Sequence, residues 1–496
     1  MTFDVHQLDM FLLVGSAVTL LAVLAVRLSA GLGLPSLLLY LFIGILIGEA
    51  GLGLGFEDAA LAHALGFAAL VVILAEGGLT TNWREVKPSM PLGGALATVG
   101  VLVSVGTVAV GSHYLLGLSW ELAVLLGAVC SPTDAAAVFS VLRVVPLPTR
   151  ITGALEAESG LNDAPTVVLV TLVSTGAFAE HGLLGAAGIV VFELVVGVVA
   201  GFAAGFGGAW LMRRVALPSS GLYPVAVLCL TFLGYGAASA VHGSGFAAVY
   251  VAALVLGNAE LPHRVATRSF AEGIAWIAQI GLFVMLGLLL SPGRIDARTV
   301  FLAVAAGLLL TFVARPLSVA VSALVRPMGW RDLAFISWGG LRGAVPIVLT
   351  TIPLAEGVEG ADDLFDLVFV MVVVFTLLSG PTLPWVSRVL GVAVPEAPRG
   401  LEVEAAPLDR VDADLLQVHL VAGSRMHGVE VGELRLPRGA SVSLVIRNGE
   451  MVVPERRTTL RTGDDLLVVT PRRVREETEG RLIEVSRRGR LARWLH

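Results

Sequence analysis

The chain has 496 residues, of which 56% are hydrophobic and only 15% are charged, and its formal net charge is −6. Soluble domains carry about 25% charged residues, so this composition excludes a soluble globular protein and indicates a polytopic membrane protein. Cys130 and Cys229 both fall in apolar stretches, so we expect two buried thiols rather than a disulfide framework or a metal site.

Runs of about 20 apolar residues predict thirteen membrane-spanning helices. The first run has no basic segment before it and is long enough to span, so we expect a retained helix rather than a signal peptide. The predicted limits are 8–29, 34–54, 60–81, 89–112, 120–142, 151–178, 183–212, 220–241, 244–259, 271–291, 298–325, 333–354 and 364–390.

The basic residues between these spans predict the orientation. One set of loops carries only Arg294 and Arg298, beside a run of acidic residues at 356–366. Because basic loops stay on the cytoplasmic side, the N-terminus is expected outside and the C-terminus in the cytoplasm. The other set of loops carries Arg27, Arg84, Lys87, Arg143, Arg150, Arg213, Arg214, Arg264, Arg268, Arg326, Arg331 and Arg388.

After the membrane region 1–394 the composition changes. Prolines and glutamates predict a polar linker over 395–410. Short apolar runs over 411–475, with the hairpin dipeptide Asn448-Gly449, predict a small, mostly β cytoplasmic domain. The arginine-rich tail 476–496 leaves two interpretations open: an amphipathic helix on lipid or on the membrane region, or a solvated tail.

Among the carboxylates in the predicted spans, we single out four that stand in stretches expected to be buried in lipid: Glu76, Asp134, Glu158 and Asp163. A charge at the centre of a membrane helix costs at least about 2.5–3.5 kcal/mol and usually marks an ion or proton path. Their number in neighbouring spans therefore indicates transport of a charged species.

The helix register places two of these carboxylates at similar depth. Asp134 lies about 14 residues, or about 21 Å, from the outer end of its span, and Asp163 about 18 Å from the cytoplasmic end of the next. Pro132 interrupts its helix and frees backbone carbonyls beside Thr133 at mid-depth, which suits a dehydrated monovalent cation.

Spacing within 158–163 separates two helix faces. Ser159 and Asp163 share one face, and Glu158 and Asn162 share the adjacent face. We expect Arg342, in a span interrupted by glycine and proline, to pair with Glu158 and neutralise its charge. For Arg315, pairing with a buried acid and extension to the cytoplasmic surface both remain open.

Four segments, in this order, closely resemble those of the monovalent cation:proton antiporters, the NhaP-like sodium/hydrogen exchangers, over about residues 8–390. The segments are Glu76-Gly77-Gly78, Ser131-Pro132-Thr133-Asp134, Glu158-Ser159-Gly160-Leu161-Asn162-Asp163 and Gly340-Leu341-Arg342-Gly343. The resemblance implies an all-α polytopic membrane fold of inverted repeats, with the fifth and twelfth spans broken and crossed. It also implies a homodimer in which a mobile core moves against an interface bundle.

The same resemblance implies roles for the site residues. Asp163 would bind a proton or a cation in turn, with Asp134, Thr133, Ser159 and Glu76 completing or supporting the site. Glu158 with Arg342 would be a structural ion pair, and Asn162 and Pro132 would support the helices. Asparagine at 162 resembles the electroneutral branch, which exchanges one cation for one proton.

Residues 415–470 resemble the TrkA-C module, the C-terminal half of the regulator of potassium conductance. Such modules are similar to dimerising sensors of small ligands, so we expect a small-molecule or nucleotide regulator and no resident cofactor. A Gly-x-Gly-x-x-Gly segment does not precede the module, which argues against direct NAD binding.

These features predict a potassium/proton antiporter in a bacterial inner membrane, in contact with lipid and without nucleic-acid partners; sodium is the alternative cation. A potassium channel is a distant alternative, because Leu233-Gly234-Tyr235-Gly236 is similar to a selectivity filter but lies in a full-length span. An enzyme is not expected, because Ser159 has no histidine in its span and the Gly-x-Ser-x-Gly segment is missing.

Overall fold

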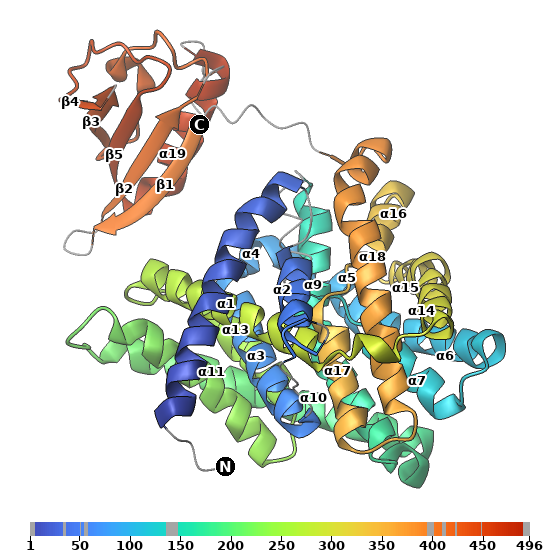
Figure 1. Ribbon diagram of the computed structural model, residues 1–496. Helices are drawn as coiled ribbons and strands as arrows, with labels where there is room; N and C mark the ends of the chain where they lie inside the picture. Colours follow the sequence, from blue (N-terminus) through green and yellow to red (C-terminus); the bar gives the residue numbers. More distant parts are fainter. Residues whose placement is uncertain are drawn as a thin grey trace. The chain divides into compact units, whose positions relative to one another are not determined.

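The computed structural model describes residues 5–32, 36–49, 51–53, 58–134, 147–393, 401–408, 413–421, 424–447 and 449–489. The chain forms two compact units, Met1–Ala393 and Val394–His496, and each is described by itself (Figure 1).

The first unit is helical throughout its described part, and helices lie at each of the thirteen predicted spans. Seven of them are individually long and apolar enough to cross a membrane among the described residues; the others are shorter, more polar or broken. In chain order the helices are α1 (Val5–Leu32), α2 (Ser36–Ile47), α3 (Ala59–Thr80), α4 (Trp83–Val86), η1 (Lys87–Ser89), α5 (Met90–Ala95), η2 (Leu96–Gly100), α6 (Val101–Leu116), α7 (Trp120–Cys130), α9 (Thr149–Ser174), α10 (Ala177–Arg214), α11 (Leu222–Ala240), α12 (Gly245–Asn258), α13 (Arg264–Leu289), η3 (Pro292–Arg294), α14 (Ala297–Leu309), η4 (Leu310–Ala314), α15 (Arg315–Ser322), α16 (Trp330–Gly339), α17 (Ala344–Ala355) and α18 (Ala361–Val389).

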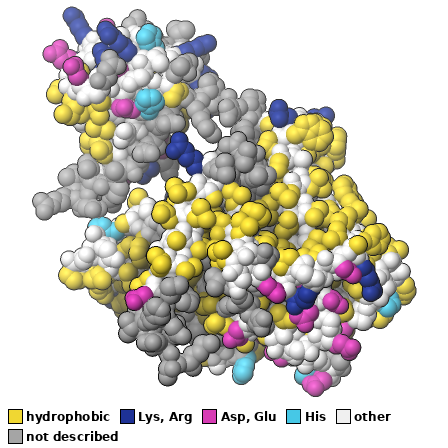
Figure 2. Space-filling model, in the orientation of Figure 1, with side chains coloured by type: hydrophobic (Ala, Val, Ile, Leu, Met, Phe, Trp, Pro, Cys, Tyr) yellow, Lys and Arg dark blue, Asp and Glu magenta, His cyan; other side chains and the backbone are white. Residues whose placement is uncertain are grey.

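The outer surface of this unit carries large hydrophobic side chains. Leu24 is 64% exposed, Phe206 62% and Phe301 68%. Figure 2 shows hydrophobic side chains spread over the face in view. An apolar surface of this extent is typical of helices that face lipid, so the unit is a multi-pass membrane domain.

The helices of this domain pack as two groups. In one, α10 packs on α11 and α12, and α13 packs on α2 and α3. The other contains α4 to α7, α9 and α14 to α18. The groups meet chiefly where α9 contacts α10 and α12 and where α17 contacts α3. Helix α9, which carries Glu158 and Asp163, therefore lies at the boundary between the groups.

The second group contains the predicted repeat. Each copy has a long helix with a π-helical turn (η2 or η4), then a broken span, then another long helix (α9 or α18). The π-turn of each copy packs against the other copy, η2 on α15 and η4 on α6. Because the copies are an odd number of spans apart, they run in opposite directions, which confirms the inverted repeat.

Both predicted helix breaks are present. Helix α7 ends at Cys130 and is followed by the non-helical residues Ser131 to Asp134, including Pro132. Helices α16 and α17 are separated by residues 340–343 and are bent by 53°. The rest of the expected fifth span, 135–142, lies outside the described residues.

The second unit contains a five-stranded antiparallel sheet of order β1-β2-β5-β3-β4 and one long helix. Register pairs Arg447 with Glu450 across the predicted hairpin, and Gly449 there has a φ of 81°, which glycine adopts without strain. The elements are β1 (Leu401–Leu408), β2 (Ala413–Leu420), η5 (Val431–Leu434), β3 (Ser441–Arg447), β4 (Glu450–Val452), β5 (Asp465–Pro471), η6 (Arg472–Val474) and α19 (Arg475–Arg488).

Two predicted boundaries of this unit are wrong. Strand β1 lies inside the range 395–410 that composition predicts as a linker. Leu401, Val403 and Ala405 alternate with glutamates there, which is a strand pattern, but the prolines and glutamates of the range favour the linker prediction. Within the predicted tail, Leu482 and Val485 are fully buried in the core of the unit. Helix α19 therefore covers the sheet, so neither a lipid-bound helix nor a solvated tail describes residues 476–488.

Candidate cation and proton site

Asp163 is the centre of the candidate site. It lies near the middle of α9, and only 3% of it is exposed. Its Oδ1 atom is buried and has no hydrogen-bond partner among the described residues. Since a buried acceptor normally finds a donor, this oxygen is available to a proton or a cation.

Asp134 joins the two helix breaks. Its backbone N–H donates to the carbonyl of Leu341 at 3.0 Å, and its Oδ2 accepts the backbone N–H of Ala344 at 2.7 Å. Ala344 begins α17, and the N-terminus of a helix carries partial positive charge that stabilises an anion. The carboxylate of one broken span thus caps the broken helix of the other.

Gly343 makes this contact possible. A Cβ atom at this position would lie 2.0 Å from Oδ2 of Asp134, which is well inside van der Waals contact. Any side chain there would displace the carboxylate or the break, so glycine is required by close approach.

Hydroxyl and amide groups connect Thr133 to α9. The Thr133 and Ser159 hydroxyl oxygens lie 3.1 Å apart, and Nδ2 of Asn162 donates to Thr133 Oγ1 at 2.9 Å. Ser159 itself donates to the carbonyl of Leu155 at 2.9 Å. The structure therefore places Thr133, Ser159 and Asn162 together, next to Asp134 and Asp163 in the chain.

Glu76 occupies a different helix. It lies half-buried on α3, which contacts both α9 and α17, and its backbone carbonyl accepts the Thr80 hydroxyl at 2.9 Å. Its helix borders the site, and its part in ion binding stays a prediction.

The predicted pair between Glu158 and Arg342 is not formed. Arg315 binds Glu158 instead, with both terminal nitrogens on the two carboxylate oxygens and an Nη2–Oε2 distance of 2.8 Å. Only 4% of the Arg315 side chain and 2% of the Glu158 side chain are exposed. Of the two open interpretations of Arg315, pairing with a buried acid is the correct one.

Arg342 binds backbone carbonyls at two helix ends. It donates to the carbonyls of Cys130, at 2.8 Å, and Gly340. Cys130 ends α7, and Gly340 follows the end of α16, so these carbonyls lack the partners that a continuing helix would supply. Arg342 supplies the missing donors at both breaks, while the π-turn η4 directly before Arg315 brings that residue toward α9.

Sequence reasoning missed Glu156 and Tyr250. Glu156, Gly160 and Asp163 follow one another at i, i+4 and i+7 and share a face of α9. The hydroxyl of Tyr250, on α12, lies 2.3 Å from where a Cβ of Gly160 would stand. A fifth carboxylate two positions before Glu158 was the available signal for Glu156; the tyrosine contact has no local sequence signal.

The site as a whole is rich in oxygen acceptors. Carboxylates, hydroxyls and carbonyls are ligands suited to hard monovalent cations. A carboxylate that binds a cation cannot hold a proton at the same time, so the two compete. This is the chemistry needed to exchange one for the other.

Comparison with known proteins identifies the family of this chain. The model of the sodium/hydrogen exchanger transmembrane family matches residues 17–389, and that of the TrkA-C domain matches residues 415–482. The chain belongs to the sodium/hydrogen exchanger family. It is therefore a transporter and not an enzyme, and the predicted regulatory module at its C-terminal end is confirmed as a TrkA-C domain.

Several members of this exchanger family are similar over most of their length. The K(+)/H(+) antiporter NhaP2 of Shewanella oneidensis is 34% identical over 473 residues, covering 94% of this chain and 82% of the relative. The K(+)/H(+) antiporter NhaP of Alkalimonas amylolytica gives the same identity and coverage. The Na(+)/H(+) antiporter ApNhaP of Aphanothece halophytica is 27% identical over 411 residues, covering 78% of this chain and 77% of the relative.

A solved exchanger structure shares the fold. The sodium proton antiporter MjNhaP1 from Methanocaldococcus jannaschii matches with a TM-score of 0.65 and 20% identity, covering 77% of this chain and 99% of that one. This likeness confirms the exchanger fold of the membrane domain.

Proposed function

We propose that this protein exchanges potassium for protons by alternating access, with Asp163 as the group that carries either ion. The observation that carries the proposal is the buried, unpartnered Oδ1 of Asp163 within the Asp134, Thr133 and Ser159 cluster. The boundary position of α9 supports it, because movement of one helix group against the other would turn Asp163 from one side of the membrane to the other.

Potassium is favoured over sodium by the extent of the similarity. The relatives named as potassium/proton antiporters match 94% of the chain, a share large enough to include the TrkA-C domain. The relative named as a sodium/proton antiporter matches 78%, a share close to that of the membrane domain alone.

The exchange is proposed to be electroneutral, one cation for one proton. Asn162 is neutral, so it adds no charge to the Asp163 carboxylate beside it. Asp163 is then the one group for which proton and cation compete, so the two loaded forms of the carrier have the same charge, whereas the empty carrier would expose an unpaired charge to the membrane. The ion-binding roles of Glu76 and Asp134 belong to this proposal.

We also propose the membrane, the orientation and the oligomeric state of the transporter. The distribution of basic loops supports an N-terminus outside and a C-terminus in the cytoplasm of a bacterial inner membrane. A homodimer is proposed from the family resemblance, with the TrkA-C domain as a sensor of a small molecule or nucleotide.

The test is cation-driven collapse of a proton gradient in proteoliposomes containing the full chain. Potassium is expected to dissipate the gradient, lithium is not, and Asp163→Asn should be silent. Glu121→Gln, at an exposed position on α7, is the matched control and should keep wild-type activity. A fully active Asp163→Asn variant would refute the assigned site.

Sodium is the alternative substrate, and the same assay separates it. Dissipation by sodium with none by potassium would keep the site and change the cation. If neither ion acts while the reconstituted protein is folded, the antiport proposal is wrong.

A further inference from the structure

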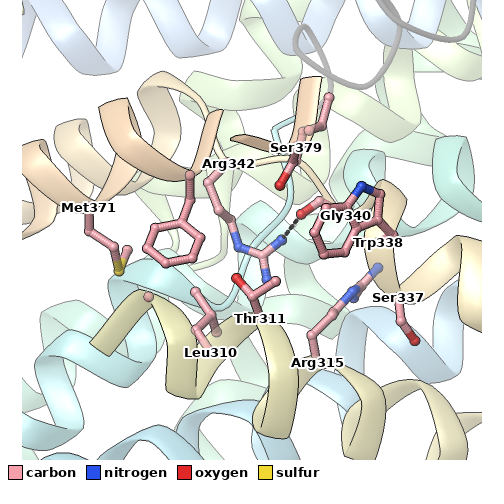
Figure 3. A pocket seen from close by; sticks show the side chains of 12 residues that line it. Leu310, Thr311, Arg315, Ser337, Trp338, Gly340, Arg342, Met371 and Ser379 are labelled. Carbon is pink, nitrogen blue, oxygen red and sulfur yellow. Dashed lines mark hydrogen bonds between the residues drawn. The ribbon is translucent and has the colours of Figure 1, made fainter. Parts of the chain in front are cut away.

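A small cavity lies inside the membrane domain, away from Asp163. It is enclosed by η4, the break between α16 and α17, and α18, and its volume is about 20 Å³ (Figure 3). That is space for about one water-sized particle. Arg315, Arg342, Thr311, Ser379 and Gly340 are among its lining residues.

Two guanidinium groups border this cavity, and only one carboxylate among the described residues pairs with them. Arg315 and Arg342 are both buried, with 3% and 7% exposed. Glu158 is bound by Arg315, whereas Arg342 is held by backbone carbonyls. Among the described residues no carboxylate lies within ion-pair distance of Arg342, so one positive charge at the cavity is without an anionic partner.

One donor at the cavity is also unsatisfied. Nε of Arg315 is buried and has no hydrogen-bond partner in the described part of the chain. A Cβ atom on Gly340 would lie 2.6 Å from it, so this nitrogen is close to Gly340, which also lines the cavity. A buried donor without an acceptor is unfavourable and rare in folded proteins.

We propose that a small monovalent anion of the halide class, chloride in the cell, binds in this cavity between Arg315 and Arg342. The groups that line it supply positive charge and donors: two guanidiniums and the hydroxyls of Thr311 and Ser379. A halide accepts hydrogen bonds from all directions and carries the missing negative charge, whereas water brings no charge. Phosphate or sulfate exceeds the space.

The bound anion would act on the architecture and would not be transported. It would hold Arg315, which pairs with Glu158, and Arg342, which satisfies the carbonyls at both helix breaks. Occupancy of the cavity would therefore stabilise the crossing of the two broken spans, at a site that does not include Asp163.

The test uses the full-length protein purified in potassium gluconate. Chloride or bromide replaces gluconate at constant potassium and ionic strength, and thermal unfolding is recorded. We expect a saturable rise in melting temperature with both halides. Crystals in bromide should show one anomalous peak per chain between Arg315 and Arg342.

Ser379→Ala removes a lining hydroxyl without touching the ion pair, and we expect it to weaken the halide dependence about tenfold. Ser104→Ala, a buried serine on α6 outside the cavity, is the matched control and should leave the dependence unchanged. A melting temperature independent of halide, or a bromide-free cavity in the presence of saturating bromide, would overturn the proposal in favour of a bound water.

Discussion

The side-chain amide of Asn162 donates a hydrogen bond to Oγ1 of Thr133, 2.9 Å away. This bond ties α9 to the break of the fifth span at the residue that precedes Asp134. Asn162 therefore has a structural role that an aspartate at this position could not fill in the same way, because an ionised carboxylate has no proton to donate.

We expect Asn162→Asp to make exchange sensitive to voltage. The added carboxylate gives the carrier a second negative charge, and moving one charge across the membrane is worth about 2.3 kcal/mol per 100 mV. The measurement is transient current on a solid-supported membrane with reconstituted protein, where wild type should give no net current. Asn162→Ala breaks the same hydrogen bond without adding charge, so it should slow exchange and stay electrically silent. Equal currents from the two variants would contradict the expectation.

Gly343→Ala should abolish transport while the protein still inserts. The new methyl group would stand 2.0 Å from Oδ2 of Asp134 and would push the carboxylate from the N-terminus of α17. Overpacking of this kind typically costs about 1–3 kcal/mol, enough to move the site without unfolding a membrane domain. Proton-gradient collapse and a detergent-stability assay separate the two effects.

Gly106→Ala is the matched control for that substitution. Gly106 lies on α6, and a Cβ there meets no atom within 4 Å. It should behave as wild type in both assays. Full transport by Gly343→Ala would show that Asp134 can leave the helix terminus without consequence.

The partner of Glu158 can be identified by charge removal. Arg315→Met leaves a buried, uncompensated carboxylate and should lower the free energy of unfolding by about 3–5 kcal/mol. Glu158→Leu combined with Arg315→Met removes both charges and should recover most of that loss, measured as melting temperature in detergent. Adding Glu158→Leu to Arg342→Met should not restore stability, since Arg342 binds backbone carbonyls and Arg315 would be left buried without its carboxylate. Recovery in the Arg342 combination alone would restore the original pairing hypothesis.

The TrkA-C domain should lose stability in acid through Asp464. Burial alone would raise the pKa of Asp464, but hydrogen bonds from the Arg447 guanidinium and the Arg461 backbone hold that pKa below its ordinary value. Because the folded-state pKa is depressed, this contribution is complete above the unfolded pKa of about 3.9 and disappears as pH falls through the folded value.

Arg447→Gln should therefore destabilise this domain at neutral pH and flatten its dependence on acid. Loss of a hydrogen bond to a charged group costs about 1.5–3 kcal/mol. Hydrogen–deuterium exchange of β5 in the full-length protein, corrected for intrinsic rates, measures both effects. Arg438→Gln, at an exposed position, is the control and should change neither.

Local sequence signals were sufficient to predict both helix breaks and one face of α9. Pro132 and the glycines of 339–343 disfavour continuous helix, so both breaks could be predicted, and the i, i+4 spacing of Ser159 and Asp163 correctly described one face of α9. Charge partners could not be predicted in this way. Two arginines were available to Glu158, and the choice between them depends on η4 and on the carbonyls of Cys130 and Gly340 that Arg342 binds, which are properties of packed helices.

In the second unit, too, local sequence was not enough to predict an element, here strand β1. Composition over 395–410 favours a linker, yet β1 pairs with β2 in register from Leu401↔Leu420 to Leu408↔Ala413. An edge strand tolerates proline and charge because one of its sides makes no ladder bonds. Pairing with β2 therefore adds to the weak alternation signal that the residues of β1 carry themselves.

The contact of Asp134 with Leu341 and Ala344 also has a consequence for biosynthesis. The hydrogen-bonded groups of Asp134 and Ala344 are 210 positions apart in the chain. While the ribosome is still making the second repeat, Asp134 has no helix terminus to cap, so the half-made protein has no ordered ion site. The capped carboxylate can therefore form only after the chain has been made as far as α17.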